Sequence, residues 1–181
     1  MRLLLASGSP RRRVLLEWAG YAVDVCPSNV GEGRNQGDDP MQHARALALR
    51  KLATAPADRV ALAADTVVHL DDLVLDKPAD RREAVAHLLA LSGRWHAVTT
   101  GVAVTGQPVF SVTTRVRFRD LLVREIESYV ATGEADDKAG AYGIQGRAAV
   151  FVAEVQGSWT NVVGLPIEPV IAALDAAGVP R

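Results

Sequence analysis

The segment that decides the fold is residues 3–13, which read Leu-Leu-Leu-Ala-Ser-Gly-Ser-Pro-Arg-Arg-Arg. Its apolar beginning, Leu3 to Ala6, is typical of a short buried strand. Ser9 and Pro10 then indicate a helix start, because serine is a preferred capping residue and proline suits the first helical position. A strand that runs directly into a helix predicts an α/β fold.

The same segment is the first candidate binding site. Gly8 lets the backbone approach a ligand closely, and the helix start presents N–H groups with a partial positive charge. Arg11 and Arg12 can add bidentate contacts to phosphate oxygens. The alternative is a capped helix whose arginines face solvent. The spacing matches neither the Walker A loop nor the dinucleotide-binding glycine pattern, so a phosphate site here would be of another kind.

The rest of the chain alternates between helical and strand patterns. Residues 27–40 and 133–147 are rich in glycine and polar residues and predict loops. Apolar periodicity predicts strands at 21–25, 60–68, 95–104, 109–118 and 148–155, and helices at 41–55, 80–91, 122–131 and 166–177, with Asp80 as the cap of the second helix. This mixture predicts an α/β fold with a mixed sheet flanked by helices. Because no linker divides the chain, we expect a single domain over residues 1–181, built as two lobes.

Composition excludes several classes of protein. The chain has 181 residues and a formal net charge of −1, so no global positive field exists to hold nucleic acid. The single cysteine, Cys26, excludes an intrachain disulfide and suits a reducing compartment. No apolar run reaches the length of a membrane span, and the apolar stretch near the start is too short for a signal peptide. We therefore expect a cytoplasmic protein with no membrane partner.

Asp65 is the second candidate feature, because it interrupts the apolar run from Ala61 to Val68. An ionised carboxylate in such a strand is costly unless a group pairs with it. A metal ion, a lysine or a catalytic role would account for it, and a strand-end aspartate that caps the backbone is the alternative. Lys51, in an alanine- and leucine-rich helix, either points inward or extends along the surface. Lys77 is either a phosphate ligand or a turn residue.

The third feature is the segment 137–146, Asp-Lys-Ala-Gly-Ala-Tyr-Gly-Ile-Gln-Gly. Its evenly spaced glycines suit a loop that wraps a flat ligand. Gln145 could read the edge of a base, since an amide side chain both donates and accepts hydrogen bonds. A glycine-rich turn without a ligand is the alternative. The histidines lack the spacing of metal ligands, so we do not expect a structural zinc site.

In combination, these segments resemble the Maf family of septum-formation-related nucleotide pyrophosphatases, over nearly the whole chain. The most specific matches are Ser-Gly-Ser-Pro-Arg-Arg from Ser7, Ala-Asp-Thr from Ala64, and Ala-Gly-Ala-Tyr-Gly-Ile-Gln-Gly from Ala139. Further matches are Glu32, Leu47-Ala48 with Lys51, Lys77-Pro78, Leu91-Ser92-Gly93 with His96, Val98 with Thr100, and Asn161-Val162-Val163-Gly164-Leu165-Pro166. Asp76 departs from the pattern, because the family commonly has glycine before this lysine.

The resemblance implies an elongated fold, similar to that of inosine triphosphate pyrophosphatases, with a central cleft between two lobes. It also implies hydrolysis of nucleoside triphosphates to the monophosphate and pyrophosphate, with Mg²⁺ or Mn²⁺ as cofactor. Asp65 would be the proton acceptor, while Arg11, Thr66 and Gln145 would bear on substrate choice. The form of the 139–146 segment is similar to that of the branch acting on dTTP and UTP.

The chemistry of this reaction assigns the remaining candidates. Lys51 and Lys77 are expected to assist Asp65 in catalysis, and Ser7, Arg11 and Arg12 to bind the substrate. Glu32 and Asp65 are the carboxylates expected near the metal. The four cations Arg11, Arg12, Lys51 and Lys77 are expected to bind the phosphates, because positioning and charge stabilisation carry most of the catalysis in phosphoryl chemistry.

Two other functions remain open on the sequence alone. A nucleotide-binding regulator of cell division without turnover would use the same basic cluster and glycine loop, although Asp65 in an apolar strand argues against it. A phosphatase of the haloacid-dehalogenase type would need Asp-x-Asp, and Val67 stands where the second aspartate belongs. The sequence indicates no dimer interface, and a homodimer remains open.

Overall fold

A computed structural model describes residues 1–31 and 39–181 of the chain. Its strands are β1 (Leu3–Leu5), β2 (Val23–Val25), β3 (Ala61–Leu70), β4 (Leu73–Leu75), β5 (Trp95–Val104), β6 (Phe110–Phe118) and β7 (Val152–Gln156). Its helices are α1 (Pro10–Trp18), α2 (Pro40–Leu52), α3 (Arg81–Leu91), α4 (Val123–Val130), α5 (Trp159–Val163) and α6 (Ile167–Ala176). Two 3₁₀ turns, η1 (Ala139–Ala141) and η2 (Arg147–Phe151), complete the elements of the described residues.

The strands form the mixed sheet that the sequence predicts. Within residues 1–31 and 39–181 the sheet has seven strands in the order β2-β1-β3-β5-β6-β7, with β4 paired to β3 outside this path. β1 pairs in parallel with β2 and β3, as expected for strands joined through helices. The hairpin of β3 and β4 and the pair of β6 and β7 are antiparallel. The α/β class with a mixed, helix-flanked sheet is confirmed.

The chain forms two compact units. The first comprises residues 1–66, 100–112 and 160–181, and the second comprises residues 67–99 and 113–159. Long strands such as β3 and β5 contribute residues to both units. A single domain over residues 1–181 stays a prediction.

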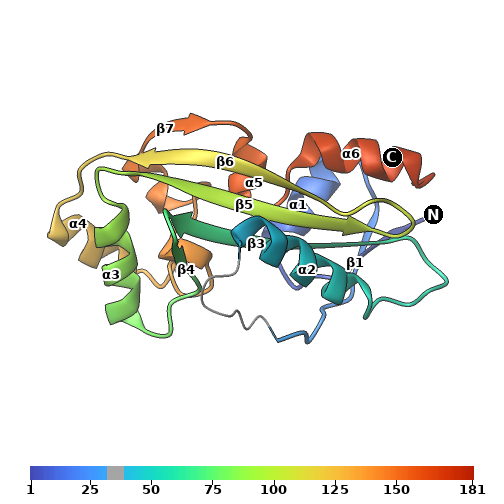
Figure 1. The fold of residues 1–181 in the computed structure, drawn as a ribbon, viewed down its shortest axis with the longest axis horizontal. Helices are drawn as coiled ribbons and strands as arrows, with labels where there is room; N and C mark the ends of the chain where they lie inside the picture. The colour runs from blue at the N-terminus through green and yellow to red at the C-terminus, as the bar shows by residue number, and fades with distance from the viewer. Residues whose placement is uncertain (32–38) are drawn as a thin grey trace. The chain divides into compact units, whose positions relative to one another are not determined.

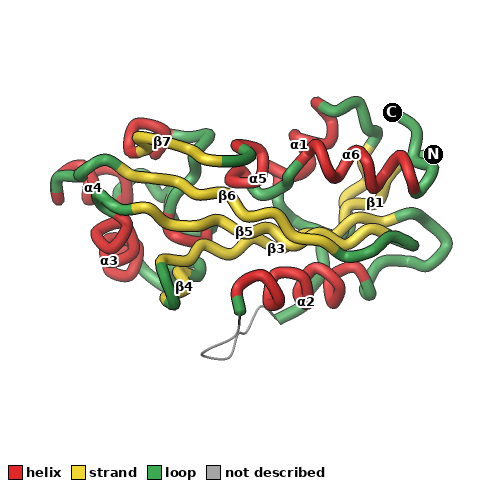
Figure 2. Tube along the Cα trace, turned by 45° about the horizontal axis from the view of Figure 1, so that its top comes forward, coloured by secondary structure: helices red, strands yellow, loops and turns green. Residues whose placement is uncertain are grey.

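Helices cover both faces of the strands in the first unit. Figure 2 shows α2 on one face, with α1 and α6 side by side on the other. The close approach of α2 depends on Gly101 of β5, because a Cβ atom there would lie 2.3 Å from the backbone carbonyl of Ala44 in α2. Leu16 of α1 and Leu174 of α6 are fully buried. The burial of such leucines accounts for this layered packing.

The second unit is built around an aromatic core. Helices α3 and α4 lie next to each other in it (Figure 1). Phe118 of β6 packs edge-to-face on Tyr142 and His96, with ring centroids 4.8 and 5.0 Å apart. Tyr129 of α4 and Phe118 both pack against Phe151. Edge-to-face pairs of this kind add to the stabilisation that burial provides.

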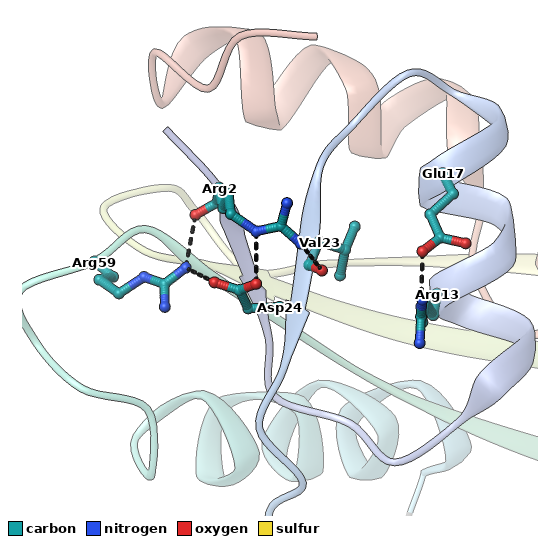
Figure 3. A network of polar contacts seen from close by, with 6 residues as sticks. All are labelled: Arg2, Arg13, Glu17, Val23, Asp24 and Arg59. Carbon is teal, nitrogen blue, oxygen red and sulfur yellow. Dashed lines mark hydrogen bonds and ion pairs between the residues drawn. The ribbon is translucent and has the colours of Figure 1, made fainter.

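A polar network joins β2 to the residues that precede β1 and β3 in the first unit (Figure 3). Asp24 of β2 accepts from Arg2 Nε at 2.6 Å and from Arg59 Nη2 at 2.7 Å. Arg2 also donates to the Val23 carbonyl, and Arg59 donates to the Arg2 carbonyl. Hydrogen bonds from Arg2 and then from Arg59 hold the pKa of the Asp24 carboxyl below its usual range. The network therefore joins the residues that precede β1 and β3 to β2.

Local sequence signals predict most of these elements correctly. The expected start and end of α3 are confirmed, including the cap from Asp80, which accepts from Glu83 N–H at 2.9 Å. The prediction of a strand over 148–155 is wrong in its first half, which is η2. Ala148 and Phe151 are buried three residues apart, which is the period of a 3₁₀ helix. Helix α5 was not predicted.

Candidate active site

A buried ion pair joins α2 to β3 in the first unit. Lys51 Nζ donates to Asp65 Oδ1 at 2.6 Å, and the two side chains are 7% and 10% exposed. Lys51 lies in the last turn of α2, and its buried neighbours Leu47 and Ala48 turn that face of the helix toward the sheet. Lys51 therefore points inward and supplies the partner that Asp65 requires. Burying two charges costs free energy that their attraction only partly returns, so such a pair is weak evidence of a purely stabilising role.

Arg12 forms a second buried cluster, and it does not face solvent. Its Nη1 donates to Ser7 Oγ at 2.9 Å and its Nη2 donates to Thr66 Oγ1 at 3.0 Å. Its Nε donates to the Gly164 carbonyl at 2.8 Å, which ties α1 to the segment after α5. The planar guanidinium is suited to hold three acceptors at once. Arg12 thereby sets the positions of Ser7 and Thr66, two of the expected substrate contacts.

Two residues that the sequence analysis left without a role extend this cluster. Thr66 Oγ1 and Thr100 Oγ1 lie 2.9 Å apart, and Thr100 donates to the Asn161 carbonyl at 3.2 Å. Thr100 and Asn161 are both fully buried. The sequence alone does not show this contact, because the approach of Thr100 in β5 to Thr66 in the neighbouring strand β3 is a tertiary property.

Asp65 and Thr66 are directed to opposite faces of β3. Successive side chains of a strand alternate, and accordingly Asp65 meets Lys51 of α2 while Thr66 meets Arg12 of α1. The pairing of β1 with β3 ends just before them, with Leu5 opposite Leu62 and a hydrogen bond from Ala6 N–H to the Leu62 carbonyl. A ligand beside β3 past the end of β1 can therefore reach groups directed to both faces.

The remaining candidate residues lie outside the Lys51–Asp65 pair and the Arg12 cluster. Lys77 is exposed, two residues after β4 in the second unit, and Asp76 beside it is also exposed. Arg11 is half-buried in the first turn of α1. Glu32 lies outside the described residues. Among the residues that the structure describes, no group of three or more His, Cys, Asp or Glu side chains is arranged to hold a metal ion.

Gln145 lies in a tight turn of the second unit. Gly146 N–H donates to the Gly143 carbonyl at 3.0 Å, so Ile144 and Gln145 are the central residues of a β-turn. Ile144 is buried and Gln145 is exposed. The turn therefore fixes its apolar residue in the core and leaves the amide available to a ligand.

A buried histidine contacts the residue that precedes this turn. His96 Nε2 and Tyr142 Oη lie 2.8 Å apart, and both side chains are buried. Burial, followed by repulsion from His69, lowers the pKa of His96 from 6.5 to about 3. Burial raises the pKa of the Tyr142 hydroxyl. At neutral pH both groups are therefore uncharged, and the hydrogen bond between them joins β5 to the residue that precedes Gly143.

Comparison with known proteins decides the family. The family model described as Maf-like protein matches residues 2–177. The chain belongs to the Maf family. That match includes every candidate site residue, Glu32 among them.

Named Maf relatives are similar to the chain along nearly its whole length. A protein of Photorhabdus laumondii named dTTP/UTP pyrophosphatase is 49% identical over 91% of this chain and 88% of its own. One from Geobacillus with the same name is 46% identical over 98% of both chains. A solved nucleoside triphosphatase / dITP/XTP pyrophosphatase of Mycobacterium abscessus is 17% identical over 65% of this chain and 74% of its own, with a TM-score of 0.42.

Within the described part of this Maf chain, none of the helices is long and apolar enough to span a membrane.

Proposed function

We propose that the chain hydrolyses dTTP and UTP to the monophosphate and pyrophosphate. The observation that carries this proposal is the buried Lys51–Asp65 pair between α2 and β3, in a chain whose Maf relatives carry the name dTTP/UTP pyrophosphatase at 46–49% identity. An ion pair that only stabilised the fold could be replaced by apolar side chains without loss. A carboxylate held beside a ligand site is instead suited to act on a water molecule.

Asp65 would position and deprotonate the water that attacks the α-phosphorus, with pyrophosphate as the leaving group. Lys51 orients the carboxylate by donating to Oδ1 at 2.6 Å. This contact keeps one carboxylate oxygen directed toward α2. The anchored carboxylate is therefore preorganised, which lowers the cost of reaching the transition state.

The phosphates would lie near the first turn of α1. Arg11, in the first turn of α1, would contact them directly, and Arg12 holds Ser7, Thr66 and the Gly164 carbonyl. Arg12 would act mainly by keeping Ser7 and Thr66 in place, and Lys77 would add a further positive charge. Asp76 beside Lys77 would weaken that contact by like-charge repulsion with the phosphates.

The described residues fit a divalent ion bound mainly by the substrate. Mg²⁺ typically takes only one or two carboxylates and fills its other positions with waters and phosphate oxygens. Asp65 supplies one carboxylate, and Glu32, outside the described residues, would supply another. Bound there, Mg²⁺ or Mn²⁺ would neutralise charge on the triphosphate and the leaving pyrophosphate.

Base selection would depend on Gln145, together with Arg11 and Thr66. The exposed amide at the tip of the 143–146 turn can donate to and accept from a pyrimidine edge. Such a hydrolase would act on free nucleotides in the cytoplasm, without nucleic acid or membrane as a partner. A regulator that binds nucleotides without turnover is the competing function.

The test is a panel of nucleoside triphosphates incubated with the protein and Mg²⁺, with products resolved by chromatography. Monophosphate plus pyrophosphate from dTTP and UTP, abolished by a chelator, is the expected result. Asp65→Asn should remove turnover and leave nucleotide binding largely intact. Binding without turnover in the wild-type protein would favour the regulator instead.

A further inference from the structure

The turn that presents Gln145 is held at its beginning by a tyrosine from α4. Gly143 N–H donates to Tyr129 Oη at 3.2 Å, in a buried position. The same hydroxyl donates to Glu134 Oε1 at 3.1 Å. Because an ionised carboxylate only accepts, Glu134 makes Tyr129 the donor and leaves its oxygen lone pairs for Gly143 N–H.

The turn is held at its end by the other oxygen of the same carboxylate. Glu134 Oε2 accepts from Arg147 N–H at 3.1 Å. Glu134 thus contacts the turn indirectly before Gln145, through Tyr129 and Gly143, and directly after Gln145, at Arg147 N–H. The two contacts are independent of the His96–Tyr142 hydrogen bond, which supports the residue before the turn.

Close packing reinforces these contacts at both glycines. A Cβ atom on Gly146 would lie 2.3 Å from Glu134 Oε1, so the carboxylate packs directly over the glycine backbone. A Cβ atom on Gly143 would lie 2.8 Å from Lys138 Cε. Lys138 in turn donates to the Glu134 carbonyl at 2.6 Å. Glycine is therefore required at 143 and 146 because any larger residue would collide with Lys138 or Glu134, and not only because of the turn.

We propose that Tyr129 and Glu134 are positioning residues for base selection, which hold the 143–147 turn so that the Gln145 amide offers a base one orientation of its donor and acceptor. The inference rests on the proposed function, in which Gln145 reads the pyrimidine edge. Uracil and cytosine differ at that edge by exchange of an acceptor for a donor. An amide in one orientation distinguishes them, whereas an amide on a loosened turn can rotate to suit either.

Two variants test this with little change of volume. Glu134→Gln replaces one acceptor by a donor, and Tyr129→Phe removes the hydroxyl that Gly143 N–H contacts. Glu154→Gln is the matched control, because Glu154 lies on β7 of the same unit and its carboxylate is exposed beside Arg117. For each protein, kcat and KM are measured for UTP and CTP, and amide hydrogen exchange is followed over residues 143–147.

Both test variants should lower the UTP-to-CTP ratio of kcat/KM about tenfold, the effect of roughly one hydrogen bond, mainly through KM for UTP. Exchange at 143–147 should become faster in both, and neither quantity should change in Glu154→Gln. A fall of equal size for UTP and CTP, or unchanged exchange in both variants, would overturn the inference.

Failure of the proposed function gives a different result. Wild-type protein that hydrolyses neither nucleotide would refute that function alone. The inference is then decided by the ratio of the Kd values for UTP and CTP together with amide exchange, and it fails if Glu134→Gln and Tyr129→Phe leave that ratio unchanged.

Discussion

Lys51 Nζ lies 2.6 Å from Asp65 Oδ1, and this contact joins the last turn of α2 to the middle of β3 with both side chains buried. Its two members are 14 residues apart in the sequence. The pair links the packing of the first unit to its proposed chemistry, because the helix that supplies the lysine is also the layer that covers one face of the sheet.

Changing this pair should separate stability from catalysis. Lys51→Met alone leaves a buried carboxylate without its partner, and we expect a loss of about 3–5 kcal/mol in the free energy of unfolding. Combining it with Asp65→Leu should restore much of that loss, while turnover stays absent in both the single and the double variant. Urea unfolding and product assays check both parts. Asp24→Asn, at an exposed carboxylate of the same unit, should leave turnover unchanged.

Gly101→Ala should move α2 away from the sheet. The new Cβ would lie 2.3 Å from the Ala44 backbone, so the helix must shift, at a cost of about 1–3 kcal/mol. Because α2 carries Lys51, turnover should fall as well. Gly31→Ala is the control, since its Cβ would have no heavy atom of residues 1–31 or 39–181 within 4 Å. Wild-type melting temperature and activity in Gly101→Ala would refute the close packing described above.

Arg12→Lys should be far from conservative. A lysine cannot hold the Ser7, Thr66 and Gly164 oxygens that the guanidinium holds together. We expect a loss of about 1–3 kcal/mol in unfolding free energy and a raised KM for the triphosphate. Arg13→Lys on the same helix, where the arginine is exposed beside Glu17, should have little effect on either. Similar behaviour of the two variants would contradict the role given to Arg12.

Acid should destabilise the protein through His96. Its pKa is about 3 in the folded chain, below the ordinary value of 6.5, so the unfolded chain binds more protons between these values. The free energy of unfolding should therefore fall as the pH drops below 6.5, by up to about 1.4 kcal/mol per pH unit for one proton. Burial lowers the pKa of His87 as well, and this adds to the slope.

The pH window distinguishes these histidines from the acidic groups. The hydrogen bond from Arg119 lowers the pKa of Glu125 from 4.5 to about 2, so its contribution is lost only as the pH falls below 4.5. His96→Gln should flatten the dependence between pH 6.5 and 5. A slope that survives His96→Gln in full would contradict the assignment.

The sequence predicts those parts of the molecule that depend on neighbouring residues. The period of apolar residues and the Asp80 cap gave α3, and the polar interruption of an apolar run singled out Asp65. It could show that Asp65 needs a partner, but whether Lys51 points inward depends on how α2 packs against Gly101. For the same reason Thr100 and Asn161 remained without a role, since only the assembled fold brings Thr100 to Thr66 and to the Asn161 carbonyl.

Short apolar segments were the second place where the sequence did not predict the secondary structure. Residues 147–151 are equally compatible with a strand and a helical turn, and the tertiary contact between Glu134 and Arg147 N–H accompanies the turn that forms. Tyr129 and Glu134 gave no local signal, because each acts through the backbone of a segment more than nine residues away.

Hydrolysis of UTP in ¹⁸O-labelled water, with Mg²⁺ present, shows directly whether water attacks the α-phosphorus. Attack by an Asp65-activated water on the α-phosphorus places the label in the monophosphate and leaves the pyrophosphate unlabelled, and Asp65→Asn should abolish this product. Label in pyrophosphate or in free phosphate, or undiminished turnover by Asp65→Asn, would contradict the account.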